Sequence, residues 1–439
     1  MTVAKSFKRF NWGLYLALLL TAAFPTVYTT ARIHFLGDLP SDWGFNIASQ
    51  LAWVNLALEV IQEALLLPLF HCIGLTIANR GMTVRKVRSG ITITLFIHAV
   101  FAAVVLLFAD SLVERMAQKP GIVDETAHYI RLEMAGTILF SLARFLGIIF
   151  ILMNLRFHIY AILAIHTVLS VCLDAFFISS LEFSLELGVN GIAYSNAIAT
   201  LAACAYSVAA FSKTMNMRFA DWRTRRGDFG WMRTWAKVGG FSGVDSLVRN
   251  AFYLLFISRM MNVVEEQGTF WIANAFIWGW LLLPLFPLAD LLKRDVAGTP
   301  MIDHRQKTAA YFGIATGLCA VWVATIPGWG TFAGAVLNAP NPEKIVALVL
   351  LLLPFYALFC FNTLMDSVFY GRGKTELLAL QSLITNVTVY GVAFVLFQAE
   401  IFTPMLNSIA LLFGAGIVVD SVITFVMYRN LLAKTGGML

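Results

Sequence analysis

The sequence HIYAILAIHTVLSVCLDAFFISS, residues 158–180, decides the fold of this chain. It is a run of 23 mostly apolar residues, long enough to cross a lipid bilayer as one helix. A carboxylate, Asp174, lies inside this run. An acid near the middle of a membrane span costs on the order of 2.5–3.5 kcal/mol on insertion scales. We therefore expect Asp174 to face a cavity or a polar partner, and we treat it as the leading candidate for function.

Polar residues at helical spacing accompany Asp174. His166, Ser170 and Asp174 follow one another at intervals of four residues, which places them on one helix face. The next apolar run, 188–211, carries four polar residues at similar spacings: Asn190, Tyr194, Asn196 and Thr200. The two neighbouring helices are expected to share a polar seam that holds something small and polar or charged.

The composition indicates a membrane protein. Of the 439 residues, 59% are hydrophobic and 13% charged, and the mean hydropathy of +0.78 excludes an ordinary soluble domain. The apolar runs are too long for the strands of a membrane barrel, so the spans are predicted to be helices. No ATPase loop or conventional catalytic motif occurs, and the five cysteines lie in apolar runs without metal or redox spacing.

Polar breaks divide the sequence into twelve predicted spans: 12–36, 46–76, 91–114, 127–154, 158–180, 188–211, 238–263, 267–292, 308–327, 343–369, 376–398 and 404–428. An even number of spans places both termini on one side. Most of the 31 Lys and Arg residues then face the cytoplasm, which predicts a multi-pass protein of the plasma membrane with cytoplasmic termini. The net charge of +6 follows from this topology, and no nucleic-acid partner is expected.

A repeat divides the chain into halves. The hexamer LLLPLF occurs at 65–70 and at 281–286, an offset of 216 residues. Chance is the alternative in so apolar a chain, but other matches share the offset. We predict two pseudo-symmetric six-helix lobes, 1–212 and 238–439, joined by a basic cytoplasmic linker, 213–237. A half with an even number of spans gives parallel repeats, with a substrate cavity between them.

The span 46–76 carries two acids, Glu59 and Glu63, four residues apart. Like charges at this spacing repel, and in a low dielectric at least one of them is expected to be protonated. A proton-sharing pair is one chemical basis for coupling to a proton gradient. The equally weighted alternative is an internal salt bridge, with Arg144 or Arg32.

The second half offers further candidates for a substrate cavity. Asn274 and Trp278 lie four residues apart, and an aromatic wall suits flat or cationic organic molecules. Trp271, near the outer edge, is interpreted as an interfacial anchor. Asp420 is discounted, because it is expected near the inner interface. The other candidates are Asp245, which is spaced to pair with Arg249, and Asn362, Asp366 and Asn386.

Several stretches together resemble a known family. VLSVCLDAFFI at 168–178, followed by LELGVNGIAYSNAIAT at 185–200, resembles the hallmark N-x-x-x-L-D-x-x-x-I and G-V-x-G-x-A-x-A-T of the MATE multidrug and toxin extrusion transporters. Three more stretches are similar to other parts of that family: AQKPGIVDETAHYIRLEMAG, GGFSGVDSLVRNAFYLLFISR and FNTLMDSVFYGRGKT. The similarity covers nearly the whole chain.

The resemblance implies a V-shaped pair of six-helix lobes and cation-coupled antiport of organic substrates. The family's cation site uses an Asp of the first span, the Asn and Asp of the hallmark and a Thr of the sixth span. Here Asp174 matches the hallmark Asp, whereas Ser170 and Asn196 stand at the Asn and Thr positions. The first span has no acid in its apolar body, and its acids, Asp38 and Asp42, come late.

The leading hypothesis is therefore a secondary active antiporter that exports organic, drug-like substrates by alternating access. It is expected to be a monomer with no cofactor other than its coupling ion, H⁺ or Na⁺. The ion would bind near Asp174, with Glu59 or Glu63 as a substitute for the missing acid. Two alternatives remain: a lipid-linked precursor flippase of the same superfamily, and an intramembrane lipid enzyme, for which His34 and Asp38 are the local pair.

Overall fold

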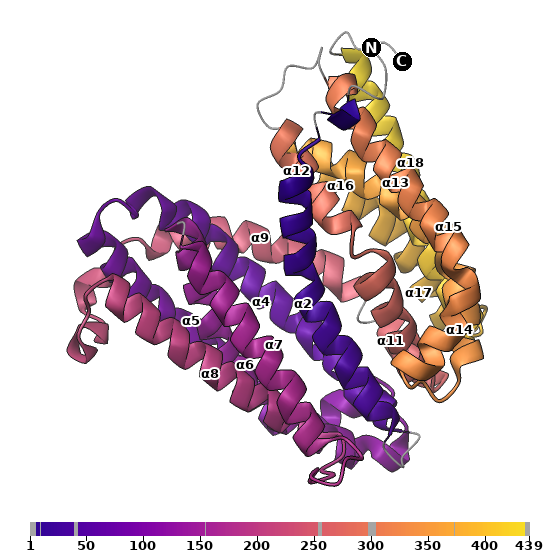
Figure 1. The fold of residues 1–439 in the computed structure, drawn as a ribbon, viewed down its shortest axis with the longest axis horizontal. Helices are drawn as coiled ribbons and strands as arrows, with labels where there is room; N and C mark the ends of the chain where they lie inside the picture. Colours follow the sequence, from indigo (N-terminus) through magenta and orange to yellow (C-terminus); the bar gives the residue numbers. More distant parts are fainter. Residues whose placement is uncertain are drawn as a thin grey trace. The chain divides into compact units, whose positions relative to one another are not determined.

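The computed structural model describes residues 6–8, 10–38, 43–153, 155–252, 257–296, 304–372 and 374–434. These ranges contain helices and no strand, so the predicted all-α class is confirmed (Figure 1). The chain forms two compact units. Unit 1 consists of Met1–Ile33 and Leu255–Leu439, and unit 2 is His34–Leu254.

Unit 2 is a bundle around a core of fully buried side chains, among them Phe145, Phe150 and Phe211. Within it α6 packs against α5 and α8, α8 packs against α7, and α9 packs against α4. Its helices are α3 (Gly44–Ser49), α4 (Leu51–Cys72), α5 (Arg80–Arg115), α6 (Val123–Leu152), α7 (Arg156–Phe177), α8 (Asn190–Thr214) and α9 (Met232–Phe252).

Helix α5 contains the predicted span 91–114 and begins before it. The Asn79 side chain accepts a hydrogen bond from the backbone N–H of Met82 at 3.1 Å, which caps the helix, so the helix begins at Arg80. The basic stretch that was interpreted as a polar break is therefore the first part of the helix. Long basic side chains tolerate this position because they reach water from a helix end.

Unit 1 is built around the pair α15 (Pro342–Gly371) and α18 (Leu406–Lys434), and Tyr356 and Phe369 of α15 are among its largest buried side chains. The first 33 residues, most of them in α2 (Trp12–Gly37), join this unit. The other elements are α10 (Arg259–Val263), α11 (Gln267–Phe276), η6 (Ile277–Leu281), α12 (Leu285–Val296), α13 (His304–Thr325), η8 (Ile326–Gly328), α14 (Trp329–Thr331), η9 (Phe332–Val336), α16 (Thr375–Thr385), η10 (Asn386–Gly391) and α17 (Val392–Gln398).

The predicted span 267–292 is broken rather than continuous. A π-helical turn, η6, ends at Leu281, and the helices on either side are bent by 54°. Pro284 follows the turn, and proline cannot donate a backbone hydrogen bond and clashes with the preceding turn. The carbonyl of Leu281 accepts instead from the indole N–H of Trp322 at 3.0 Å.

The described part of the chain contains nine helices that are long and apolar enough to cross a membrane, or ten if the bent pair is one span. The chain is thus a multi-pass membrane protein. Helices α4 and α9, which cover the predicted spans 46–76 and 238–263, are not among these. The count of twelve therefore stays a prediction.

The contact-based units have other boundaries than the predicted lobes. Residues 1–33 group with the second half of the chain, and α9 groups with the first half. The lobes 1–212 and 238–439 and their pseudo-symmetry stay a prediction.

Small residues let α9 approach α4 closely. Gly239 and Gly243 are four residues apart on α9, and a Cβ at either position would meet Ala64 of α4. Such small residues are typical of close helix contacts in membranes. The indole N–H of Trp235 donates to the carbonyl of Leu65 at 2.8 Å and fixes the register of the two helices.

Gly239→Ala is expected to destabilise unit 2, because the new Cβ would lie 2.1 Å from the carbonyl oxygen of Ala64. Overpacking of this kind costs about 1–3 kcal/mol. The neighbouring Gly240 has open space around its Cβ position, so Gly240→Ala should be neutral or slightly stabilising. Thermal unfolding of the two purified variants in detergent tests the pair. Equal unfolding temperatures would contradict the close approach.

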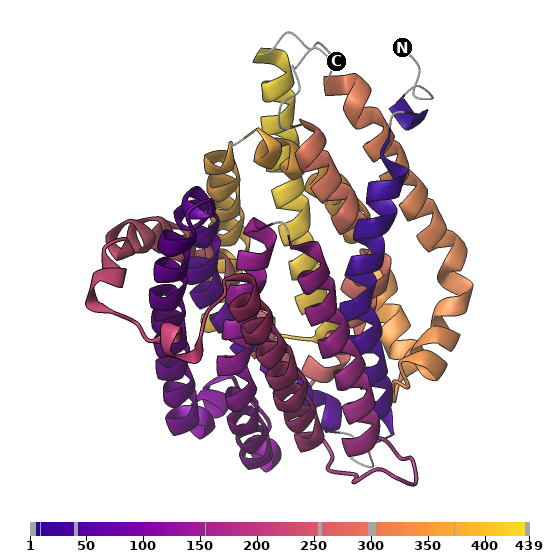
Figure 2. The same ribbon diagram turned by 60° about the vertical axis from the view of Figure 1, so that its left-hand side comes forward.

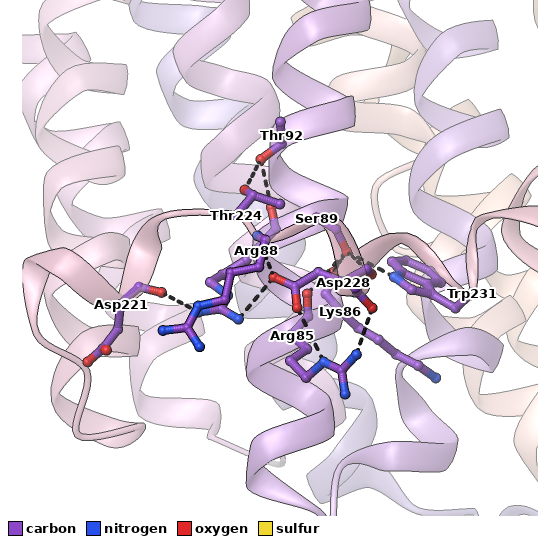
Figure 3. Close-up of polar contacts among 11 residues, drawn as sticks. Arg85, Lys86, Arg88, Ser89, Thr92, Asp221, Thr224, Asp228 and Trp231 are labelled. Atoms are coloured by element: carbon purple, nitrogen blue, oxygen red, sulfur yellow. Dashed lines mark hydrogen bonds and ion pairs between the residues drawn. The ribbon is translucent and has the colours of Figure 1, made fainter.

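The linker after α8 folds back onto the start of α5 (Figure 2). Asp228 of η4 (Arg226–Phe229) pairs with Arg88 at 2.9 Å and with Arg85 at 3.2 Å (Figure 3). Ser89 donates to the carbonyl of Asp228 at 2.9 Å and accepts from the indole N–H of Trp231 at 2.9 Å. Charge pairs and hydrogen bonds thus hold this part of the predicted linker against α5.

The charge pairs also set the acidity of Asp228. Burial alone would raise the pKa of this carboxyl, but the backbone N–H of Arg225 and the charges of Arg88 and Arg85 outweigh burial and hold the pKa below its ordinary value. The ionised carboxylate therefore stabilises the fold above the unfolded-state pKa. This stabilisation is lost as the pH falls through the lowered folded-state pKa.

Asp228→Asn is expected to lower the unfolding temperature at neutral pH, because it leaves the buried guanidinium of Arg88 without its counter-charge. Breaking a buried pair costs on the order of 3 kcal/mol. The difference from the wild type should persist from pH 7 to pH 5 and shrink below about pH 4, where the wild-type carboxylate protonates. Asp221→Asn is the control, since that carboxylate accepts from the backbone N–H of Arg218 at an exposed site. A difference that grows with acidity would contradict this account.

Candidate functional site

Asp174 is fully buried, with 0% of its surface exposed. It lies in the last turn of α7, which ends at Phe177, and not near the middle of its helix. Ser170, one turn earlier, is also buried, and its Oγ has no hydrogen-bond partner in the described part of the chain. A carboxylate and an unsatisfied hydroxyl therefore face the interior of unit 2 side by side on α7.

One polar contact of the predicted seam between α7 and α8 is present. The Nε2 of His166 lies 3.5 Å from the Oγ1 of Thr200, which joins the two helices. Ser195 of α8 is buried and has an unpartnered Oγ among the described residues. Tyr194 is not part of the seam, because its side chain is exposed beside the ring of Phe177.

Glu133 of α6 is a buried acid that the sequence analysis missed. Its Oε1 accepts from the side-chain amide of Asn196 at 2.7 Å and from the hydroxyl of Tyr129 at 3.2 Å. Asn196 was expected to act with Asp174; the structure shows that its amide donates to Glu133, and its role beside Asp174 stays a prediction. A usable signal was the four-residue spacing of Tyr129 and Glu133, inside a stretch that was used for its family resemblance, and of Thr137 just after it.

One of the two acids of α4, Glu59, lies near a cation of α6. Arg144 interacts electrostatically with Glu59 and donates a short hydrogen bond to the side chain of Gln62. This arrangement is consistent with the salt-bridge alternative for Glu59. Glu63, one turn further along α4, is half-buried. Whether either acid takes part in coupling stays a prediction.

Unit 1 contains a cavity of about 360 Å³ between α2 and the broken span. Asn274 and Trp278 both line it, as expected for neighbours on one helix face. Trp271 lines it too, and its interpretation as an interfacial anchor stays a prediction. The remaining wall is polar on one side: Thr26, Thr29 and Thr30 of α2 contribute three hydroxyls.

Hydrogen bonds fix the aromatic wall of this cavity. The indole N–H of Trp278 donates to the hydroxyl of Tyr356 at 2.9 Å, and that hydroxyl donates to the Oδ1 of Asn274 at 3.3 Å. Trp278 belongs to the π-helical turn η6, an irregularity that is frequent at functional sites. In the same turn the carbonyl of Gly279 accepts from Thr26 at 3.0 Å.

Unit 2 has a larger cavity, about 620 Å³, with an acidic lining that includes Asp38, Asp124, Glu125 and Glu186. Asp38 accepts a hydrogen bond from Ser180 at 3.3 Å. Asp42, the other late acid of the first span, lies outside the described residues. Asp174 does not line this cavity.

The remaining predicted residues of the second half are dispersed. Asn362 and Asp366 lie in a polar cluster with Asp420, which the sequence analysis had discounted. They do not line the cavity of Asn274 and Trp278. Asn386 is buried at the start of η10 and donates to the carbonyl of Ser382 at 2.8 Å. Asp245 falls in α9, but its side chain is outside those described.

The described residues contain no candidate site for a transition metal. No group of three or more His, Cys, Asp or Glu side chains that could hold a metal ion occurs among those residues.

Known proteins of similar sequence were not found: no protein-family model and no curated protein matches the chain. Solved structures do match. A multidrug resistance MATE family transporter of the MOP superfamily, in its inward-facing conformation, superimposes with a TM-score of 0.79 and 16% identity, over 96% of this chain and 98% of its own.

Two further structures show the same similarity. A MOP superfamily transporter from Pyrococcus furiosus gives a TM-score of 0.68 and 15% identity, over 97% of this chain and 96% of its own. The MATE transporter VcmN of Vibrio cholerae gives a TM-score of 0.65 and 15% identity, over 98% of this chain and 97% of its own. The resemblance seen in the sequence is confirmed at the level of the fold. The chain therefore has the fold of the MATE transporters of the MOP superfamily.

Proposed function

We propose that this chain is a secondary active transporter that exports organic molecules by alternating access, in exchange for H⁺ or Na⁺. The single observation that carries the proposal is the complete burial of Asp174 beside the polar seam of α7 and α8. The fold shared with MATE transporters supports it.

The burial of Asp174 gives a physical basis for coupling. An ionised carboxylate is costly to bury in a low dielectric, so a bound cation or proton stabilises any conformation that encloses it. A conformation that opens the site to water does not need that neutralisation. Cation binding therefore shifts the population between conformations, by as much as its affinity differs between them.

The cavity of unit 1 supports an organic substrate of modest size. Its volume is at the lower end of the range for small-molecule sites, and it combines two indole rings with hydroxyl and amide groups. Indole faces attract flat and cationic molecules, and the polar groups fix their orientation. We propose that Asn274, Trp278 and Trp271 contact the substrate.

The proposed oligomeric state, membrane and orientation are those expected from the sequence. We propose a monomer in the plasma membrane with both termini in the cytoplasm, no nucleic-acid partner, no enzymatic activity and no cofactor beyond the coupling ion. The excess of Lys and Arg in the predicted cytoplasmic segments supports the orientation.

The test is transport by the purified protein in liposomes, with pH and Na⁺ gradients imposed separately. A fluorescent planar organic cation should move against its own gradient under one of the two and stay in place without either. Movement under neither gradient would contradict the proposal. Gradient-independent movement of a lipid-linked precursor, with no movement of the organic cation, would favour the flippase alternative.

A further inference from the structure

The linker between α8 and α9 lies at the depth of the lipid headgroups. From Gly90 to Ala109, α5 carries no Asp, Glu, Lys or Arg, and this stretch is long enough to cross the hydrocarbon core. The part of α5 before Gly90 therefore lies outside that core. The linker packs against this part, and the hydroxyls of Thr224 and Thr92 lie 2.7 Å apart (Figure 3). Since Thr92 is in the first turn of the uncharged stretch, Thr224 lies at the edge of the hydrocarbon.

Aromatic side chains of the linker fit the same depth. Trp222 is half-buried, and its indole N–H donates to the hydroxyl of Ser212 at 3.1 Å. Trp231 is half-buried as well, and the ring of Phe229 is 37% exposed. Tryptophan is enriched where a membrane meets water, because its ring is apolar and its N–H is polar. The linker thus presents both apolar rings and polar groups at this level.

The linker also carries a surplus of positive charge. Residues 213–237 include seven Lys and Arg but only two acids. The carboxylate of Asp228 pairs with two arginines of α5, and that of Asp221 accepts from a backbone N–H. Arg223 and Arg225 are exposed, and within the described ranges neither guanidinium group has a hydrogen bond or an ion pair. Two cationic groups are therefore available to a ligand.

The backbone places these two arginines on one side of the linker. Arg223 has φ −67° and ψ 121°, and Arg225 has φ −114° and ψ 152°, which is extended backbone at both residues. Successive side chains alternate along an extended segment, so the two arginines share the side opposite Thr224. Thr224 contacts α5, and the arginines therefore project away from that helix. The backbone N–H of Arg225 donates to Asp228 at 3.0 Å, which holds the segment in this conformation.

We propose that Arg223 and Arg225 together bind the phosphate of an anionic phospholipid, such as phosphatidylglycerol, in the leaflet where α5 begins. Guanidinium groups match phosphate oxygens with paired hydrogen bonds, and basic clusters beside a membrane span attract anionic lipids. The depth of the linker favours a lipid over a soluble anion, because the acyl chains of a lipid bound there stay in the bilayer. This binding is independent of the proposed transport and would hold if the chain exported nothing.

The experiment is native mass spectrometry of the full chain in a neutral detergent. The protein is mixed with equal amounts of phosphatidylglycerol and phosphatidylcholine that carry the same acyl chains, and the ratio of the two bound lipids is measured. The wild type should prefer phosphatidylglycerol. Each basic residue near an anionic surface changes binding by roughly five-fold, so Arg223→Gln together with Arg225→Gln should lower this preference roughly 25-fold.

Arg115→Gln is the matched control. Arg115 is an exposed arginine in the last turn of the same helix α5, at its opposite end, and its loss should leave the preference unchanged. The double variant removes only exposed side chains, so its unfolding temperature without lipid should equal that of the wild type. If the double variant fails to fold, Arg223→Gln alone tests the site and should lower the preference roughly five-fold.

Soluble anions distinguish a lipid site from other anion sites. Inorganic phosphate and a single-stranded DNA oligonucleotide are added as competitors, and neither should displace phosphatidylglycerol at equal concentration. Displacement by either would overturn the inference in favour of a soluble ligand. It is also overturned if the wild type shows no preference over phosphatidylcholine, if the folded variants keep the wild-type preference, or if Arg115→Gln loses as much of it as they do.

Discussion

Asp174→Asn is expected to lower gradient-driven efflux strongly while the protein remains folded. The substituted amide has nearly the size of the carboxylate but cannot ionise, so neither a proton nor Na⁺ is attracted to it. A ligand shifts a conformational equilibrium only by the difference between its affinities for the two states. Coupling energies of this kind correspond to roughly 5- to 150-fold changes, and efflux should fall by that factor. Transport in liposomes under an imposed gradient is the measurement.

The dependence on the coupling ion separates a coupling role from a structural one. Wild-type efflux should change with the concentration of the coupling ion, H⁺ or Na⁺, on the side where it binds, whereas the residual activity of Asp174→Asn should not. Asp174→Glu keeps an ionisable group and should restore part of the activity. Asp110→Asn is the matched control in unit 2, since Asp110 is half exposed and pairs with Arg131 at 2.5 Å. Full activity in Asp174→Asn would rule out the coupling role.

Hydropathy was sufficient for the class of fold, because a helix that crosses a bilayer must hide its backbone polar groups in apolar sequence. The spacing of polar residues predicted that His166 faces α8, because residues four apart share a helix face. Helix ends were less predictable. The helix that begins at Arg80 is capped by Asn79, and at the break after Leu281 the carbonyl of that residue is satisfied by Trp322, 41 residues away.

The candidate sites were less predictable than the fold, because spacing within one helix does not show which helix lies opposite. Asn196 was matched to Asp174 along the sequence, but packing of α6 against α8 places it on Glu133. Asp420 was discounted from its position in the chain, and its partner Asn362 lies 58 residues earlier. Trp271 was interpreted as an interfacial anchor from its position in the sequence, and the structure adds that it lines a cavity together with threonines of α2.

Trp278→Ala is expected to raise the KM for a planar organic cation, with a much smaller effect on kcat. The indole of Trp278 is 41% exposed and lines the cavity, so its face is available to a substrate. A cation over such a face gains about 0.5–2 kcal/mol. Since 1.4 kcal/mol corresponds to a factor of ten, KM should rise roughly 2- to 30-fold. Initial rates of efflux at increasing substrate concentration give the two constants.

Two further substitutions distinguish substrate contact from loss of structure. Trp278→Phe keeps an aromatic face but removes the N–H that donates to Tyr356, so its KM should lie between those of the wild type and Trp278→Ala. Trp12→Ala removes another exposed indole of unit 1, 45% exposed and outside the cavity, and should leave KM unchanged. If Trp278→Ala and Trp12→Ala raised KM equally, the effect would come from general weakening of unit 1. The cavity would then not be the place where substrate binds.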